Sequence, residues 1–439
     1  MKAYIQNLSQ QIFSSLNPSE EVALFLHSEE SFFVRFNGAK VRQNTNVNQH
    51  ELTITFQAEQ RVLKQTFNLT CDLQSDLNQA LSLIDIARKQ LPLTDINPQY
   101  VGLTNGGLSE NIKKVNRPSD DQVIQIITEV FEGCDLAGLW CSGPLRQVSA
   151  NSLGQFHYFE NDYFFFDYSI YNGPKAAKGF FSATEWNIDQ FKTRAQNTKN
   201  KLQLLMRETK IVPRGKYNVY LEPMAVNEIM GTMSWGGLSQ AAYKQGRSPI
   251  KLLIEQQKSL AATVDLSENF ESGFVPRFNA LGEKVPETIS LIEQGQLKNL
   301  LTSSATAQEF KLDSNFANPN ESPRALKLRA GTLKKDLVLK ELGTGLYLSN
   351  LHYINWSDIN SGRMTGMTRF ACFWVENGEI IAPIQDLRFD ETIYNILGEN
   401  CLAISDETEV FVDVMTYAKR SLGITEVPGL LIKDFNFTL

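Results

Sequence analysis

The segment Tyr217–Thr232 reads YNVYLEPMAVNEIMGT and combines a strand pattern with a helix pattern. Its first five residues alternate and are rich in residue types that favour strands. Pro223 follows, where proline suits the first turn of a helix, and the apolar residues after it recur at helical spacing. The segment therefore predicts a strand that leads into a helix, and this helix carries Asn227, Glu228 and Thr232.

Upstream of this segment, groups of strands alternate with long helices. Alternating apolar runs predict strands, and apolar residues three or four apart predict helices. The expected strands are Glu21–Leu26, Ser31–Phe36, Glu51–Phe56, Leu63–Phe67, Ala137–Cys141, Gln147–Ala150, Gln155–Phe159 and Tyr163–Tyr168. The expected helices are Leu73–Leu91, Asp120–Glu132 (capped by Ser119) and Thr184–Met206, with a polar loop over Thr94–Pro118. We expect the aromatic run Tyr163–Phe166 in the core.

Downstream of the segment, short strands and tight turns dominate. Asn377-Gly378 and Gln294-Gly295 each separate two apolar runs, and residues of these types tolerate the positive φ of a two-residue hairpin. A Pro/Gly turn at Val212–Gly215 divides the two halves. We therefore expect an α+β protein. Its N-terminal domain, residues 1–210, should hold a mixed sheet with long helices, and its C-terminal domain, residues 211–439, should be strand-rich with antiparallel and mixed sheets.

The composition is that of a soluble globular chain. The 439 residues are 42% hydrophobic and 21% charged, which suits two or three domains with ample core. No apolar run is long enough to cross a membrane, and the first residues lack a signal-type stretch, so we expect a cytoplasmic protein. The net charge of −7 argues against a nucleic-acid partner, because non-specific binding to nucleic acid needs a basic surface.

Cysteine and histidine are few and scattered. The five cysteines form no C-x-x-C pair, and we expect them as buried, reduced thiols. No two of the four histidines lie within five residues of each other. A zinc site would need residues that are distant in sequence to converge, so no metal or cofactor is expected.

The predicted helix resembles the metal helix of the TldD/PmbA family, the "modulator of DNA gyrase" proteins of the TldD/TldE metalloprotease system. The catalytic branch of that family carries His-Glu-x-x-x-His, commonly with Gly before the second His. On this chain Asn227 falls on the first His and Thr232 on the second, while Glu228 and Gly231 match the Glu and the Gly. Positions five apart lie about 140° apart on a regular helix, so a π-type widening would be needed to bring them together.

Further stretches carry the resemblance over nearly the whole chain. They are the matching segments Arg277–Gly282, Ile289–Leu301, Leu342–Tyr347 and Phe373–Ile384, together with looser matches at Phe33–Asn37 and Val148–Ser152. No single motif is decisive, whereas the order and spacing of all of them resemble the family.

The departures from the family pattern concern the metal. The catalytic branch adds a Cys ligand near the C-terminus, and Leu402–Leu439 contains no Cys. Amide and hydroxyl oxygens are weak zinc ligands beside imidazole and thiolate, so Asn227, Glu228 and Thr232 read as a degenerate metal motif. The chain is similar to the PmbA/TldE branch, which lacks the zinc motif. The resemblance implies a non-catalytic subunit of a peptidase complex that cleaves unfolded peptides and matures some peptide antibiotics. Its expected partner is a TldD-like catalytic subunit, a second copy of itself, or both.

The role of Glu228 and the function of the chain each leave two interpretations open. Glu228 is either a vestigial catalytic residue or a helix residue with a structural role. The alternative function is an active peptidase or hydrolase of the same family with relocated catalytic residues, for instance Glu228 as a base or Cys372 as a nucleophile. A nucleophilic Cys372 needs an activating group nearby, and His352 is the only His within 25 residues of it.

Overall fold

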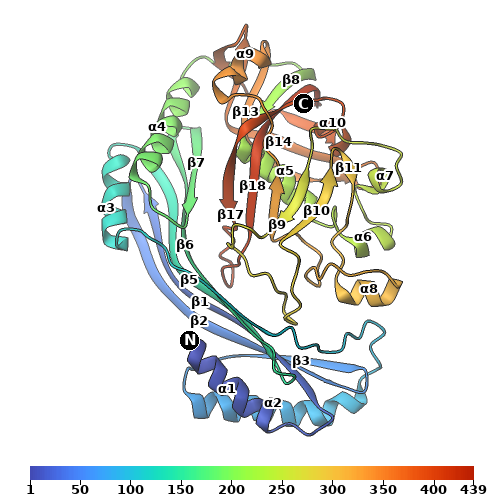
Figure 1. The fold of residues 1–439 in the computed structure, drawn as a ribbon. Helices are drawn as coiled ribbons and strands as arrows, with labels where there is room; N and C mark the ends of the chain where they lie inside the picture. Colours follow the sequence, from blue (N-terminus) through green and yellow to red (C-terminus); the bar gives the residue numbers. More distant parts are fainter.

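The computed structural model describes all residues, 1–439, and contains two large mixed sheets. Residues 21–183 form a seven-stranded sheet, and residues 215–437 form an eleven-stranded sheet. Each sheet combines antiparallel pairs with at least one parallel pair. The prediction of an α+β fold is therefore confirmed. In Figure 1 the first sheet curves around the second half of the chain, with its concave face turned toward it.

The first sheet consists of long strands in the order β3-β2-β1-β5-β6-β4, with β7 also paired to β6. The bounds are β1 (Glu21–Asn37), β2 (Lys40–Ala58), β3 (Arg61–Asn68), β4 (Leu108–Lys113), β5 (Asp135–Asn151), β6 (Phe156–Asn172) and β7 (Lys175–Ala183). The prediction of separate short strands is wrong at three places. Each of β1, β5 and β6 is one continuous strand where two had been predicted. The polar residues between the apolar runs pair within the sheet, and some of them contact the second half, as Asn161 does through the carbonyl of Phe274. β4 lies in the segment predicted as a loop, and β7 was not predicted.

Two pairs of helices cover the convex face of the first sheet. At one end α1 (Lys2–Ser14) and α2 (Leu73–Gln90) pack on β1 and β2. At the other end α3 (Asp120–Val130) packs on β5 and β6, and α4 (Ile188–Leu205) packs on β6 and β7. Ser119 caps α3 as predicted, in a reciprocal pair with Gln122. α4 begins four residues later than expected because Asn187 accepts a hydrogen bond from the backbone N–H of Gln190 and so caps the helix there.

The second sheet has the order β11-β10-β9-β12-β18-β16-β14-β13-β8, with β15 on β14, β17 on β18, and a further pairing of β18 with β8. Its strands are β8 (Gly215–Leu221), β9 (Leu266–Asn269), β10 (Thr288–Glu293), β11 (Gln296–Leu297), β12 (Ala325–Leu328), β13 (Gly345–Asp358), β14 (Arg363–Glu376), β15 (Glu379–Pro383), β16 (Arg388–Thr392), β17 (Cys401–Val412) and β18 (Ile424–Phe437). The helices of this half are α5 (Pro223–Met233), α6 (Gln240–Lys244), α7 (Lys251–Ile254), α8 (Ser304–Phe310), α9 (Val338–Leu342) and α10 (Ile393–Ile396).

Both predicted two-residue hairpins are confirmed. Gln294 and Gly295 join β10 to β11 with φ of 48° and 73°. Asn377 and Gly378 join β14 to β15 with φ of 52° and 82°. Two consecutive positive φ values define the turn type that matches the twist of a hairpin.

The two halves share one apolar core. Along β6, Tyr163 and Phe165 face the second half, whereas Phe164 and Phe166 face α3 and α4, and all four are fully buried. The aromatic run therefore lies in the core, as predicted. Phe180 of β7 stacks on Phe411 of β17 with ring centroids 5.5 Å apart. Such packing couples the concave face of the first sheet to the second sheet.

The cysteines form no disulfide. Cys141, Cys372 and Cys401 are buried, whereas Cys71 is exposed and Cys134 partly exposed, so the expectation of buried thiols fails at two positions. None of the helices combines the length and the apolar character that a bilayer crossing requires.

Candidate functional site

The helix α5 lies directly after β8, as the opening segment predicts (Figure 1). Pro223 is its first residue, and the backbone N–H of Val226 donates to the carbonyl of Glu222 at 3.0 Å. The apolar side of the helix packs on β13 and β18. The fully buried apolar residues of that side are Ala225, Val226, Ile229, Met230 and Met233. The position of α5 is thus set by its own amphipathic pattern.

The structure does not bring Asn227 and Thr232 together. The helix is regular α-helix from Pro223 to Met233, with no π-type widening. Asn227 is half-buried and Glu228 is exposed, whereas Thr232 is buried and its hydroxyl donates to the carbonyl of Glu228 at 3.1 Å. The two outer positions of the motif therefore point in different directions, as expected for residues about 140° apart on a regular helix.

The side chains at this site do not fit a zinc ion. Zinc in proteins is held by three or four His, Cys, Asp or Glu side chains. No group of three such side chains that could hold a metal gathers anywhere in residues 1–439. Glu228 is the one carboxylate of the motif, and Thr232 has its hydroxyl committed to the backbone.

Glu228 faces a charged pair on the first sheet. Lys178 of β7 forms an ion pair with Asp167 of β6, and both act electrostatically on the Glu228 carboxyl. Solvent reaches this side chain, but protein surrounds it on most sides, and this burial raises the pKa of Glu228. Lys178 partly offsets the rise and Asp167 adds to it. The Glu228 carboxyl therefore stays protonated up to a higher pH than an ordinary Glu does.

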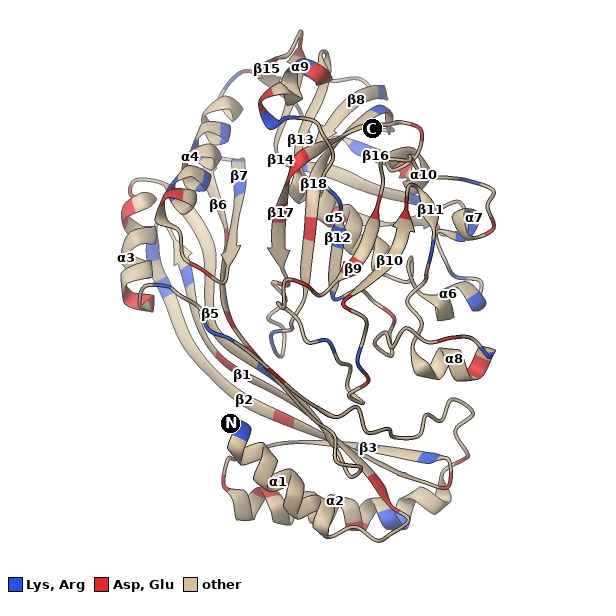
Figure 2. Ribbon diagram, viewed as in Figure 1, with Lys and Arg blue, Asp and Glu red and all other residues tan.

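A cavity of about 370 Å³ opens beside the start of α5, between α4 and the second sheet. Figure 2 shows basic residues on α4 and β7 and acidic residues on β17. Arg194 of α4 pairs with Glu409 at 2.8 Å, and Lys201 of α4 pairs with Glu222 at 2.6 Å. The hydroxyl of Tyr347 also donates to Glu222. The cavity therefore lies between the two halves and is bridged by ion pairs.

Sequence reasoning missed Lys178 because β7 was not predicted, and it missed the role of Asp167 although that residue lies in the predicted strand Tyr163–Tyr168. The strand signal was present in the run Lys175–Ala183, which pairs with β6 over its whole length. No local pattern, however, shows that β6 and β7 lie opposite α5. That relation depends on the packing of the two halves.

The structure does not support Cys372 as a nucleophile. The side chain is buried, its thiol donates to the carbonyl of Arg369 at 3.3 Å, and burial raises its pKa to about 11. His352 lies opposite Met367, five residues from Cys372 along β14. Five residues of strand span about 16 Å. The thiol therefore lacks both the activating group and the thiolate character that nucleophilic chemistry needs.

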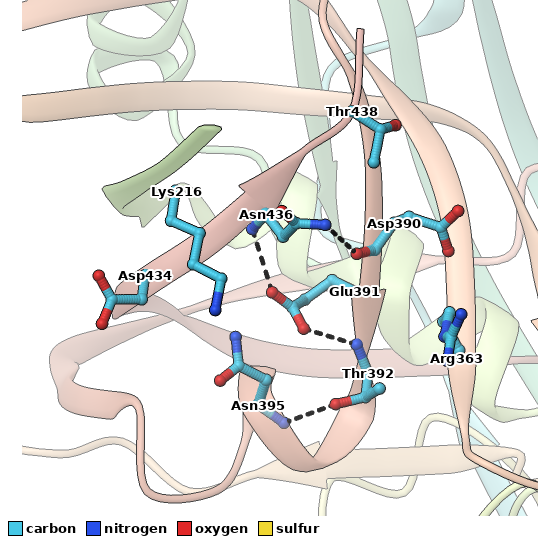
Figure 3. A pocket seen from close by; sticks show the side chains of 9 residues that line it. All are labelled: Lys216, Arg363, Asp390, Glu391, Thr392, Asn395, Asp434, Asn436 and Thr438. Atoms are coloured by element: carbon cyan, nitrogen blue, oxygen red, sulfur yellow. Dashed lines mark hydrogen bonds between the residues drawn. The ribbon is translucent and has the colours of Figure 1, made fainter. Parts of the chain in front are cut away.

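A separate polar pocket of about 460 Å³ lies at one end of the second sheet, and no apolar side chain lines it (Figure 3). Burial raises the pKa of Glu391, whose carboxylate accepts from the backbone N–H of Thr392 at 2.8 Å and of Asn436 at 3.1 Å. Lys216 and Arg363 also line it. Its residues come from four distant segments, so no sequence motif points to it. Both oxygens of Glu391 already have backbone partners, so its buried carboxylate has a structural role.

The family model described as "PmbA/TldA metallopeptidase C-terminal domain" matches residues 214–439, which is more than half of the chain. The matched region begins just before β8 and includes α5. The chain therefore belongs to the TldD/PmbA family of metallopeptidase-like proteins.

Three solved structures have a similar fold over the full chain. A Thermotoga maritima protein named as a modulator of a DNA gyrase has a TM-score of 0.78 at 16% identity, covering 99% of this chain and 100% of that one. TldE from Thermococcus kodakarensis has a TM-score of 0.78 at 12% identity, with 99% and 100% coverage. A Bacteroides thetaiotaomicron protein named as a modulator of DNA gyrase has a TM-score of 0.78 at 15% identity, with 100% and 98% coverage. At these identities the likeness shows the fold. No curated protein matches the chain significantly.

Proposed function

We propose that this chain is the non-catalytic subunit of a TldD/TldE-type peptidase complex that acts on unfolded peptides. The observation that carries the proposal is the chemistry of α5. Asn227 and Thr232 occupy the ligand positions of the family motif, and Thr232 is turned inward with its hydroxyl bonded to the helix backbone. A helix of this kind keeps the family's scaffold without its metal ligands.

The cavity beside α5 supports a role in holding peptide. Its lining combines charged groups such as Lys178 and Glu409 with apolar groups such as Phe180, Met224 and Leu339. A mixed lining of this kind suits the polar backbone and varied side chains of an unfolded peptide. We place the complex in the cytoplasm and assign it no nucleic-acid partner, in keeping with the acidic net charge of −7.

The proposed partner is a TldD-like catalytic chain, with a homodimer formed when that partner is missing. One surface that supports an interface is the loop after β17, where Met415 and Tyr417 are 63% and 90% exposed. Large exposed side chains of these two types are enriched at protein interfaces. Arg420 anchors the base of this loop on the first sheet through hydrogen bonds to Ser31 and Gly143. The position of the exposed tip is therefore fixed relative to the sheet.

The division into domains at residues 210 and 211 remains part of the proposal. Exposed residues flank the division, among them Met206 and Ile211. The shared core predicts that a protease cutting between Met206 and Gly215 leaves the two halves associated in gel filtration. Separation of the halves after one cut would contradict a shared core.

The alternative function is an active hydrolase of the same family that uses Glu228. Its raised pKa suits a general acid or base. This alternative predicts that the isolated chain cleaves peptides and that Glu228→Gln abolishes the cleavage. The subunit proposal predicts that the isolated chain has no activity for Glu228→Gln to remove.

The test of association is light scattering on the purified chain, alone and mixed with a TldD-like chain from the same organism. We expect the mass of a homodimer alone and the mass of a one-to-one complex in the mixture. A monomer alone that stays separate from the catalytic chain would overturn the subunit proposal.

A further inference from the structure

A second pocket between the two halves lies far along the concave face from Glu228. In the first sheet, His27 of β1 lies directly opposite Gln147 of β5, and Gln147 lies opposite Phe159 of β6. Phe159 is eight residues along β6 from Asp167, which corresponds to about 26 Å of strand. The pocket at His27 is therefore a different place from the cavity beside α5.

Two loops of the second half fill the face between these places. Phe274 packs edge-on against Tyr163, with centroids 4.8 Å apart. The side-chain amide of Asn161 donates to the carbonyl of Phe274 at 2.9 Å. Arg420 lies over the other side of the same region, with its guanidinium 4.4 Å from the Tyr163 ring. These contacts separate the two cavities from each other.

The lining of the second pocket is cationic and amide-rich. Its volume is about 400 Å³, within the range of small-ligand sites. His27 and Gln147 line it from the first sheet, and Arg324, Lys419 and Asn318 line it from the second half. Phe25 and Phe278 supply aromatic surface. None of the lining residues is Asp or Glu.

Two buried nitrogen atoms of the lining residues have no hydrogen-bond partner. His27 is 7% exposed, and its Nε2 has no hydrogen-bond partner of good geometry, although the backbone of Arg420 lies close enough to act on the ring. Arg324 donates through Nη1 to the carbonyls of Pro276 at 3.0 Å and Phe278 at 2.9 Å, while its buried Nη2 is unpaired. Buried polar groups in proteins nearly always have partners, so such groups in the wall of a pocket point to a ligand.

Three carboxylates lie near the pocket without lining it. Glu29 accepts from the backbone N–H of Arg420 at 3.0 Å and from the side chain of Gln49 at 2.8 Å. Glu51 pairs with Lys419 at the rim of the pocket. Glu268 accepts from the backbone N–H of Arg324 at 2.7 Å, and together with Arg324 it lines a small neighbouring cavity of about 10 Å³. Its second oxygen is buried without a partner, and its charge acts on the Arg324 guanidinium. None of these three carboxylates lines the pocket itself, whose charged lining groups are cationic.

We propose that this pocket binds the C-terminal carboxylate of a peptide. His27, Arg324 and Lys419 receive the carboxylate. The side-chain amides of Gln147 and Asn318 face the last peptide groups, and Phe25 and Phe278 cover an apolar terminal side chain. A free carboxylate such as acetate would satisfy the donors, but it would leave the amides and aromatic rings unused. The proposal concerns this chain alone and holds whether or not a catalytic partner exists.

Binding should be coupled to a proton on His27. Burial and the charge of Lys419 lower the pKa of His27, and the opposing influences of Glu29 and Glu51 are smaller. A bound carboxylate raises that pKa, so the complex takes up a proton. Affinity should therefore fall as pH rises through the pKa of His27 in the free chain, which lies below the ordinary value of 6.5.

The experiment is calorimetric titration of the purified chain with N-acetyl-Ala-Leu as the free acid, its carboxamide, and acetate. We expect the free acid to bind about tenfold or more tightly than the carboxamide, since hydrogen bonds to a charged group are the stronger ones. His27→Gln should weaken binding of the acid and remove its pH dependence. Lys419→Met, at the exposed rim, should weaken it by about tenfold. His352→Gln, at an exposed histidine on β13, is the matched control and should bind as the unmodified chain does.

Several results would overturn the proposal. Equal binding of acid and carboxamide, or no binding of either, removes the carboxylate site. Acetate competing as well as the dipeptide removes the assignment to a peptide terminus. If His27→Gln fails to fold, as judged by circular dichroism, Lys419→Met decides alone, and unchanged affinity in that variant contradicts the proposal. None of these outcomes depends on peptidase activity, so a failure here is distinct from a failure of the subunit proposal.

Discussion

The guanidinium of Arg420 lies over the ring of Tyr163, 4.4 Å from its centroid, and joins the two halves of the molecule. Arg420 follows β17 in the second half, and Tyr163 belongs to β6 in the first sheet. Arg420 is fully buried, and its Nη1 donates to the hydroxyl of Ser31 at 2.9 Å and the carbonyl of Gly143 at 3.0 Å. This contact holds the loop after β17 on the concave face.

Arg420→Met should lower the free energy of unfolding by about 2–4 kcal/mol, because it removes the stacking on Tyr163 and leaves the Ser31 hydroxyl and the Gly143 carbonyl without their donor. Arg329→Met is the control, since the Arg329 side chain is 64% exposed in its pair with Asp265 and should change stability by less than about 1 kcal/mol. Calorimetric melting of both variants checks the difference. Equal melting temperatures for Arg420→Met and the unmodified chain would contradict the account.

Gly231→Ala should stabilise the isolated chain by about 0.5–1 kcal/mol, because Gly231 lies within α5 and alanine favours a helix. A Cβ at this position meets nothing within 4 Å. Gly173→Ala is the matched control, because that site is equally open but has φ of 56°, which strains alanine. Chemical unfolding measures both changes. A loss of stability in Gly231→Ala would show that the helix is not regular there.

Gly231→Ala also tests whether α5 takes part in an interface with a partner chain. If Gly231 faces a partner chain closely, Gly231→Ala will raise the stability of the isolated chain and weaken its association. Light scattering on the variant separates the two effects.

Glu228 predicts a pH dependence of stability. Its pKa in the folded chain is raised above the ordinary value of 4.5. The folded state therefore favours the protonated carboxyl, and this contribution to stability is full below about pH 4.5 and is lost as pH rises through the raised pKa. Glu228→Gln should match the unmodified chain at low pH and melt at a higher temperature near neutral pH. Parallel melting curves across that range would contradict the raised pKa.

The absence of a complete ligand set predicts that the purified chain carries no stoichiometric zinc. Amide and hydroxyl oxygens compete poorly with imidazole and thiolate for this ion. Elemental analysis after mild chelation measures the content. About one zinc per chain would contradict the prediction. It would require a site built from residues far apart in the sequence, and the structure brings no such group of ligands together.

Local signals in the sequence predict local structure well. Asn377 and Gly378 both adopt positive φ in the expected hairpin, and Pro223 begins the expected helix. Long strands are predicted less well, because polar residues such as Glu160 and Asn161 interrupt the apolar pattern of β6. Asn161 is nevertheless buried, since its side chain donates to the carbonyl of Phe274 in the second half.

The candidate sites depend on contacts that no local pattern contains. The positions Asn227, Glu228 and Thr232 could be located from the family motif, but their directions follow from the regular helix. The pocket at His27 depends on the strand register with Gln147 and on loops some 300 or 400 residues along the chain, at Asn318 and Lys419. A single histidine in an apolar strand gives no sign of such a neighbourhood.

The most direct measurement of the central claim is the peptidase activity of a TldD-like chain from the same organism on an unfolded peptide, with and without this chain. We predict that activity requires this chain and survives its Glu228→Gln variant nearly unchanged, because the subunit proposal assigns the catalytic metal to the partner. A partner that is equally active alone, or a complex that Glu228→Gln inactivates without loss of association, would contradict the claim.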